Sequence, residues 1–176
     1  MSFDQEFFRN NRLRLMNEHP DSLIFVAANT PMQRSGDSCY PFRQDSNFWY
    51  LTGIDDPNLL LIIDTKYDRE LIVYKPKPKE ILIFEGDYDF DRYKDVSGID
   101  TFATPQDIVK LFSVENGFYK IYLNLAKKRW GIGVNPFRRF AQKELKKYTN
   151  KISDIRPSMD SLRMIKQPCE VKLIKK

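Results

Sequence analysis

The spacing of apolar residues along the chain predicts helices alternating with strands. Up to about Asn17, Phe7, Phe8, Leu15 and Met16 lie on one side of an expected amphipathic helix. Five strand-like apolar runs follow: SLIFVAA from Ser22, FWYLTG from Phe48, LLLIIDT from Leu59, ELIVYK from Glu70 and EILIFEG from Glu80. The first and third are continuously apolar, which is typical of strands covered on both faces of a sheet.

The second half of the chain adds further helices and strands. In TPQDIVKLF, Thr104 is placed to cap a helix whose first residue is Pro105. The runs FYKIYLNL and ISDI predict strands, and NPFRRFAQKELKKY and PSMDSLRMI predict helices. Together these helices and strands predict an α/β domain of three layers with a mixed sheet. QPCEVKLIKK begins one more helix at Pro168 and stops early, so we expect one domain over residues 1–165 and the start of a second over 166–176.

Composition narrows the class of protein. The chain has 176 residues, of which 41% are hydrophobic, enough for one real core. Its longest apolar runs are far shorter than the roughly twenty residues that cross a bilayer, and its start lacks a signal sequence. We therefore expect a cytoplasmic protein without a membrane partner. Cys39 and Cys169 predict free thiols, with a disulfide between them left open.

The net charge of +5 raises the question of nucleic acid. The basic groups KPKPK, KKR, KELKK and the terminal IKK lie in separate segments, and no aromatic and basic signature accompanies them. Solvated surface charge is the favoured interpretation, and no nucleic-acid partner is expected. A stand-alone basic nucleic-acid-binding or RNase H-like module is kept as the alternative from another class.

Covalent catalysis is not supported by the residues present. The triplet GDS at Gly36 would need a histidine base, and the only histidine, His19, precedes Pro20 at an expected helix end, where it is placed to cap carbonyls. No G-x-S-x-G elbow, dinucleotide fingerprint or P-loop occurs. We expect no catalytic residue in this chain.

Metal binding fares no better. Asp87, Asp89 and Asp91 imitate the start of a calcium loop, but Arg92 stands where that loop needs glycine and Gly98 where it needs glutamate. One histidine and two isolated cysteines offer few zinc ligands. An all-carboxylate magnesium site remains only a weak option, because nothing selects its carboxylates. The interpretation is that the chain holds no metal.

The polar stretch RSGDSCYPFRQDSNFWYLTG, from Arg34 to Gly53, is typical of a loop that satisfies its own hydrogen bonds. Arg34 and Arg43 can pair with Asp37 and Asp45, and its serines can cap turns.

This stretch, continued to RSGDSCYPFRQDSNFWYLTGIDDP, closely resembles the N-terminal domain of aminopeptidase P, the Xaa-Pro aminopeptidase of the creatinase and prolidase group. ILIFEG and IRPSMDSLRMIKQPCEVKLIKK agree with that family in order and spacing. The resemblance spans nearly the whole chain and is loose between Asp87 and Asn150.

The resemblance implies a creatinase/prolidase N-terminal fold of RNase H-like type, followed in the intact enzyme by a catalytic pita-bread domain with two manganese ions. It implies release of the residue ahead of proline from peptides, an oligomer (dimer or tetramer) when intact, and an N-terminal domain that is inactive alone but contributes subunit contacts and gating. Three residues match framing positions: Asp37, Arg156 beside the site entrance, and Phe84, where some members carry a substrate-covering tryptophan. A prolidase-like dipeptidase is the alternative within the group.

Overall fold

The computed structural model describes residues 3–114, 120–124 and 152–175. In chain order the elements are α1 (Gln5–Glu18), β1 (Ser22–Ala27), β2 (Gln33–Ser35), β3 (Ser38–Cys39), α2 (Ser46–Thr52), β4 (Leu60–Asp64), β5 (Arg69–Val73), α3 (Lys79–Glu85), α4 (Phe90–Ser97), β6 (Phe102–Ala103), α5 (Pro105–Val114), β7 (Lys120–Leu123), β8 (Ile152–Asp154), α7 (Arg156–Met164) and α8 (Pro168–Ile174).

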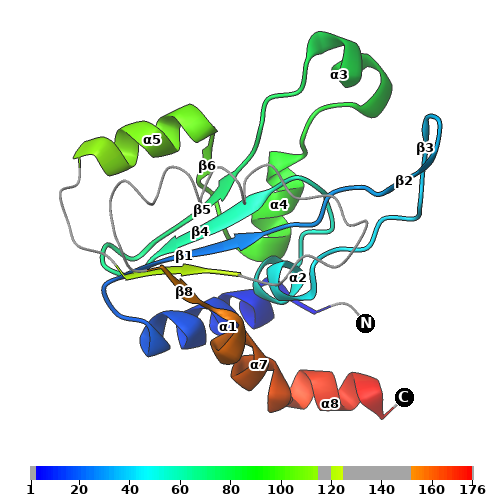
Figure 1. Cartoon of the computed structure of the whole chain (residues 1–176). Coiled ribbons are helices and arrows are strands. Elements are labelled where there is room, and N and C mark those ends of the chain that lie inside the picture. Colours follow the sequence, from blue (N-terminus) through cyan, green and yellow to red (C-terminus); the bar gives the residue numbers. More distant parts are fainter. Residues whose placement is uncertain (1–2, 115–119, 125–151, 176) are drawn as a thin grey trace.

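Six strands form one mixed sheet in the order β6-β5-β4-β1-β7-β8, and β2 and β3 form a separate hairpin (Figure 1). β4 is antiparallel to both of its neighbours, whereas the other pairings are parallel. Every strand of the sheet except β4 therefore runs in the same direction. The strands predicted at Ser22, Leu59, Glu70 and Ile152 are confirmed, and the described part of FYKIYLNL is β7.

Helices cover both faces of this sheet, as the continuous apolar runs predicted. One face packs Ile24, Leu61 and Ile72 against the helices α1, α2, α4 and α7. The other face packs Phe25, Ile62 and their neighbours with Ile108 of α5. The predicted three-layer α/β architecture is confirmed, and in the described part of the chain no helix is both long enough and apolar enough to span a membrane.

Two predicted strands are helices. FWYLTG belongs to α2, where Asp45 accepts hydrogen bonds from the backbone N–H groups of Asn47 (2.9 Å) and Phe48 (3.0 Å), and Gly53 ends the helix at φ +70°. Aromatic residues favour strands, but the cap at each end decides this segment. EILIFEG forms α3 between Pro78 and Gly86. The predicted helix NPFRRFAQKELKKY lies outside the described residues.

A buried arginine joins the elements on the α1 face of the sheet. Arg12 is fully buried and lies four residues after Phe8 on the apolar side of α1. Its Nη1 and Nη2 donate to the backbone oxygens of Leu51 (2.7 Å) and Ser97 (2.8 Å), and its Nε lies 2.9 Å from Oε1 of Glu70. One side chain thus ties α1 to α2, α4 and β5.

Candidate functional site at the carboxyl edge of the sheet

The three predicted framing residues lie on segments that leave the same edge of the sheet. β1, β5 and β8 are parallel, so their carboxyl ends lie together. The β2–β3 hairpin with Asp37 follows β1, α3 with Phe84 follows β5, and Arg156 comes two residues after β8. The structure therefore places Asp37, Phe84 and Arg156 at one edge, each on a separate segment.

Asp37 lies in the turn of the β2–β3 hairpin, which projects from the body of the domain (Figure 1). The turn uses Gly36 at φ +50°, a conformation that glycine adopts without steric cost. A backbone hydrogen bond of 2.9 Å from Tyr40 to Met32 closes the hairpin, and the side chain of Gln33 donates to the oxygen of Gly36. Asp37 is exposed and carries its charge into solvent.

Phe84 lies on α3, a helix that buries none of its side chains. Phe84 is 87% exposed and Ile83 is 80% exposed, so two large apolar side chains face solvent next to each other. Lys77 holds the base of this helix: its Nζ donates to the oxygen of Gly86 at 2.9 Å and lies 3.5 Å from Oε2 of Glu85. α3 is held by polar contacts at its base, and its apolar side chains are left available.

Arg156 is engaged locally. Its Nε donates to Oδ2 of Asp154 at 2.7 Å, and its backbone N–H donates to Oδ1 at 3.1 Å. The hydrogen bond to Asp154 raises the pKa of Arg156, so the guanidinium stays charged. The geometry shows Arg156 in a local salt bridge with Asp154 at the start of α7.

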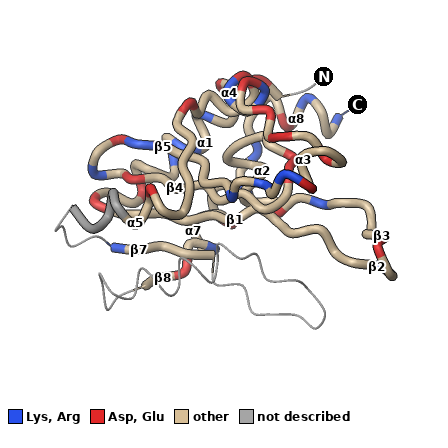
Figure 2. The backbone as a smooth tube through the Cα atoms, turned by 90° about the horizontal axis from the view of Figure 1, so that it is seen from above, with Lys and Arg blue, Asp and Glu red and all other residues tan. Residues whose placement is uncertain are grey.

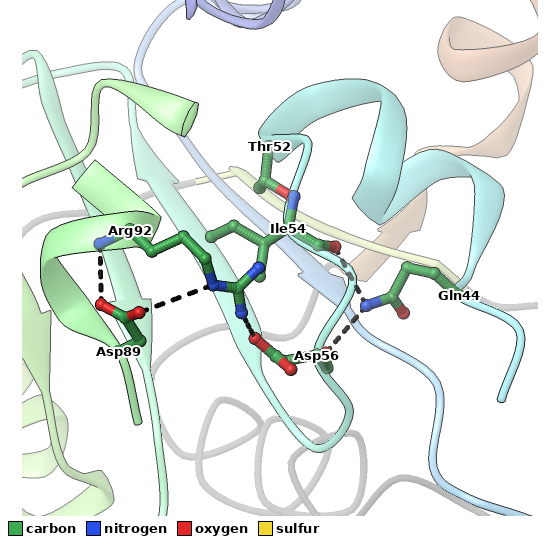
Figure 3. A network of polar contacts seen from close by, with 6 residues as sticks. All are labelled: Gln44, Thr52, Ile54, Asp56, Asp89 and Arg92. Carbon is green, nitrogen blue, oxygen red and sulfur yellow. Dashed lines mark hydrogen bonds and ion pairs between the residues drawn. The ribbon is translucent and has the colours of Figure 1, made fainter. Parts of the chain in front are cut away.

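Gln44, which the sequence did not single out as a site residue, organises the loops at this edge (Figure 3). Its Oε1 accepts hydrogen bonds of 2.9 Å from the backbone N–H groups of Asn29 and Asp45. Its Nε2 donates to the oxygens of Asp56 (2.8 Å) and Ile54 (3.2 Å). One amide thus joins the chain before the hairpin, the chain after it and the loop after α2. No local pattern marks this role, because all four partners are backbone atoms.

Beside Gln44, Arg92 of α4 binds the carboxylate of Asp56, and its Nε lies 3.9 Å from Oδ2 of Asp89 (Figure 3). Asp89, which imitated a calcium ligand in the sequence, instead caps α4 by accepting from the backbone N–H of Arg92 at 3.0 Å. Burial, and then a hydrogen bond with Asp56, raise the pKa of Tyr93, which keeps its hydroxyl protonated. A polar pocket of about 160 Å³ opens between these residues and Lys77. Charged side chains that line it form ion pairs with one another, Lys77 with Glu85 and Arg92 with Asp56, which is typical of a structural network.

The histidine and the cysteines, which were weighed for catalysis and metal binding, have structural surroundings of their own. The ring of His19 shares a 2.8 Å hydrogen bond with Oγ of Ser158, and its backbone N–H caps the oxygen of Met16. The predicted carbonyl cap is therefore made by the backbone, and the ring reaches α7. Cys39 and Cys169 are free thiols, as predicted, and both are exposed. Within residues 3–114, 120–124 and 152–175, no group of three or more histidine, cysteine, aspartate or glutamate side chains could hold a metal ion.

Charge is spread over the molecule. Figure 2 shows basic and acidic positions interspersed along the described chain, without separation into a basic and an acidic face. This distribution favours solvated surface charge.

Comparison with known proteins assigns this fold to a family. The model of the family "Aminopeptidase P, N-terminal domain" matches residues 8–117, which is more than half of the chain. The chain belongs to this family. This match confirms the resemblance to the aminopeptidase P N-terminal domain that was noted in the stretch from Arg34.

Two curated relatives are much longer than this chain. The chain is 27% identical to Xaa-Pro aminopeptidase of Haemophilus influenzae, covering 97% of this chain and 39% of the relative. It is 24% identical to Xaa-Pro aminopeptidase of Escherichia coli, covering 98% and 41%. The chain spans about two fifths of the length of these relatives.

Solved structures agree on the fold. A structure from Bacillus anthracis, 27% identical, matches with a TM-score of 0.80 over 98% of this chain and 43% of that one. The low-pH form of Escherichia coli aminopeptidase P matches with a TM-score of 0.77 at 23% identity, over 98% and 41%. The predicted creatinase/prolidase N-terminal type of fold is confirmed.

Proposed function

We propose that this chain serves as the non-catalytic N-terminal domain of an Xaa-Pro aminopeptidase, an enzyme that releases the first residue of peptides with proline second. The family match supports this proposal, together with two curated relatives that carry that name and of which this chain covers about two fifths. The same names favour an aminopeptidase over a prolidase-like dipeptidase and over a stand-alone nucleic-acid-binding module. The cytoplasm is the compartment that we propose.

The metal centre of the intact enzyme would be two manganese ions held outside the residues described here. The described side chains do not fit such a centre, because they provide no cluster of three potential ligands. A zinc-substituted Escherichia coli aminopeptidase P has been solved in complex with product, which supports metal dependence in the family.

The role of the domain would be to frame the active site and to contact a neighbouring subunit in a dimer or tetramer. Asp37 offers an exposed carboxylate in the hairpin turn, and Arg156 a guanidinium paired with Asp154 at the start of α7. Phe84 and Ile83 expose apolar surface on α3 that is suited to packing against a proline ring or another subunit. We propose the boundary between this domain and the catalytic domain at residues 165 and 166.

The experiment compares the 176-residue chain with the longer product of the same gene. With added manganese, the longer product should hydrolyse Xaa-Pro peptides, and the pure 176-residue chain should not. Turnover by the short chain would refute the division of labour, and inactivity of the longer product on every Xaa-Pro peptide would refute the substrate class. Phe84→Ala in the longer product should weaken subunit association, measured by sedimentation velocity.

A further inference from the structure

The last helix, α8, is too short to be stable by itself. It has seven residues and buries none of them, whereas isolated helices shorter than about 12 to 15 residues are marginal in water. Extended backbone at Ile165 and Gln167 separates it from α7. Its position must therefore come from contacts with the rest of the domain.

Glu170 supplies the first of these contacts. Its Oε2 accepts from the backbone N–H of Gln167 at 2.8 Å, which caps the helix, and from the hydroxyl of Tyr50 at 3.1 Å, which ties the helix to α2. Burial raises the pKa of Tyr50, so this hydroxyl remains a donor across the neutral range. The same carboxylate thus starts α8 and anchors it.

Asn11 supplies the second contact from α1. It is fully buried, and its Nδ2 donates to the backbone oxygen of Tyr50 at 2.9 Å. Its Oδ1 accepts from Nε2 of Gln167 at 2.6 Å. A buried amide is costly unless both of its ends are bonded, and here the second bond exists only when α8 is in place.

The end of α7 is fixed as well. Nη1 of Arg163 donates to Oδ1 of Asn47 at 2.9 Å, and its guanidinium lies 6.0 Å from the ring centre of Tyr50. The bend between α7 and α8 is therefore held on both sides by α2. In Figures 1 and 2, α8 extends towards the same side of the molecule as the β2–β3 hairpin.

We propose that four residues fix the direction in which the chain leaves this domain; they are called the α8 anchor and are Asn11, Tyr50, Gln167 and Glu170. They act as positioning residues for the carboxyl edge of the sheet, where the three framing residues lie. This inference rests on the proposed function, because it assigns to α8 the start of the catalytic domain. The anchor would hold Asp37, Phe84 and Arg156 at a set distance from the metal centre of that domain.

The anchor is tested first in the 176-residue chain, where activity plays no part. The double variant Tyr50→Phe with Gln167→Ala removes both contacts and keeps the aromatic ring in the core. Hydrogen exchange followed by mass spectrometry should show amides of residues 169–175 exchanging at least about tenfold faster, with α1 and β4 unchanged. The matched controls are Tyr40→Phe on the hairpin and Lys172→Ala on the exposed side of α8, which should leave the exchange rates as they are.

A distance measurement gives the direction of α8 directly. Spin labels on Cys169 and on a new cysteine at an exposed position of α1, Arg9→Cys in a Cys39→Ser background, should give a narrow distance distribution that broadens when Tyr50→Phe is added. An α8 that exchanges at unprotected rates in the parent chain, or a distribution that Tyr50→Phe leaves unchanged, overturns the inference. If the double variant also speeds exchange in α1 and β4, the inference is decided by the single variant Tyr50→Phe in the same two measurements.

The longer product tests the consequence for the reaction. Releasing the anchor should raise KM for Xaa-Pro peptides by about threefold or more and change kcat by less than about twofold, because the walls of the site move and the metal chemistry does not. An unchanged KM overturns the positioning role. If the longer product has no Xaa-Pro activity but α8 is anchored in the short chain, the proposed function fails and the anchor itself stands.

Discussion

The strand β4 and the helix α3 are both rich in leucine and isoleucine, yet every residue of β4 is buried and none of α3 is. β4 is paired on both sides, with β1 and β5, and has helices over both faces. α3 follows Pro76 and Pro78, which carry the chain off the end of β5. Apolar content alone therefore does not decide burial, and position relative to the sheet does.

This difference separates two parts of the molecule. The packed part is the sheet with the helices α1, α2, α4 and α7, where polar side chains such as Arg12 bond across elements. The projecting part is the β2–β3 hairpin together with α3, where contacts are mostly local. Substitutions in the packed part should cost stability, and matched substitutions in the projecting part should cost binding or activity.

The largest expected difference is between two arginines. Arg12→Leu leaves Glu70 and two backbone oxygens without their partner, which should lower the free energy of unfolding by about 3–5 kcal/mol. Arg92→Leu removes an exposed ion pair, worth about 0–1 kcal/mol. Urea unfolding followed by circular dichroism measures both. Equal losses would contradict the view that burial, rather than the ion pair itself, decides the cost of losing an arginine.

A pair of isoleucines tests the opening comparison itself. Ile62 of β4 is completely buried, so Ile62→Ala should cost about 2–5 kcal/mol through lost burial and a cavity. Ile83→Ala on α3 should stay within about 0.5 kcal/mol, because that side chain is 80% exposed and alanine favours helices. The readout is the midpoint of urea unfolding. A loss above 1 kcal/mol for Ile83→Ala would mean that α3 packs against the domain in solution.

Two glycines with left-handed backbone, Gly53 and Gly36, should differ less in the stability that an alanine substitution costs. A Cβ at Gly53 would lie 2.5 Å from Cε2 of Phe8 and 2.6 Å from Cγ1 of Val96, whereas a Cβ at Gly36 meets nothing within 4 Å. Both alanine variants bear the backbone cost, and Gly53→Ala adds overpacking of about 1–3 kcal/mol. Thermal unfolding of the two variants measures the difference. Equal melting temperatures would show that the ring of Phe8 moves aside without a cost in stability.

The caps around α2 also show what sequence could and could not give. The strands β1, β4, β5 and β8, the α1 helix, the helix starts at Pro105 and Pro168 and the family resemblance were available from local patterns. The helix α2 was missed because its aromatic residues favour strands, although Asp45 and Gly53 marked its ends. Gln44 and Asn11 were out of reach, since all but one of their partners lie at least 10 residues away in the sequence.

The smallest expected effect is a pH dependence at the contact between α1 and α7. Burial lowers the pKa of His19 below 6.5; the charge of Glu18 raises it and Lys120 lowers it further. The unfolded chain thus binds the proton more tightly, so the contribution of His19 to stability is complete above pH 6.5 and declines as the pH falls from 6.5 towards the lowered pKa. Because His19 is the only histidine, its ring protons can be followed by NMR without ambiguity.

The control is His19→Gln, which should remove this decline while leaving the acid unfolding of the carboxylates in place. The ring is also packed at 4.3 Å from Tyr122, so protonation acts on a side chain that contacts both β7 and, through Ser158, α7. A midpoint for His19 at or above 6.5 would mean that Glu18 outweighs burial there. It would also mean that the ring of His19 is less buried against Tyr122 and Ser158 in solution.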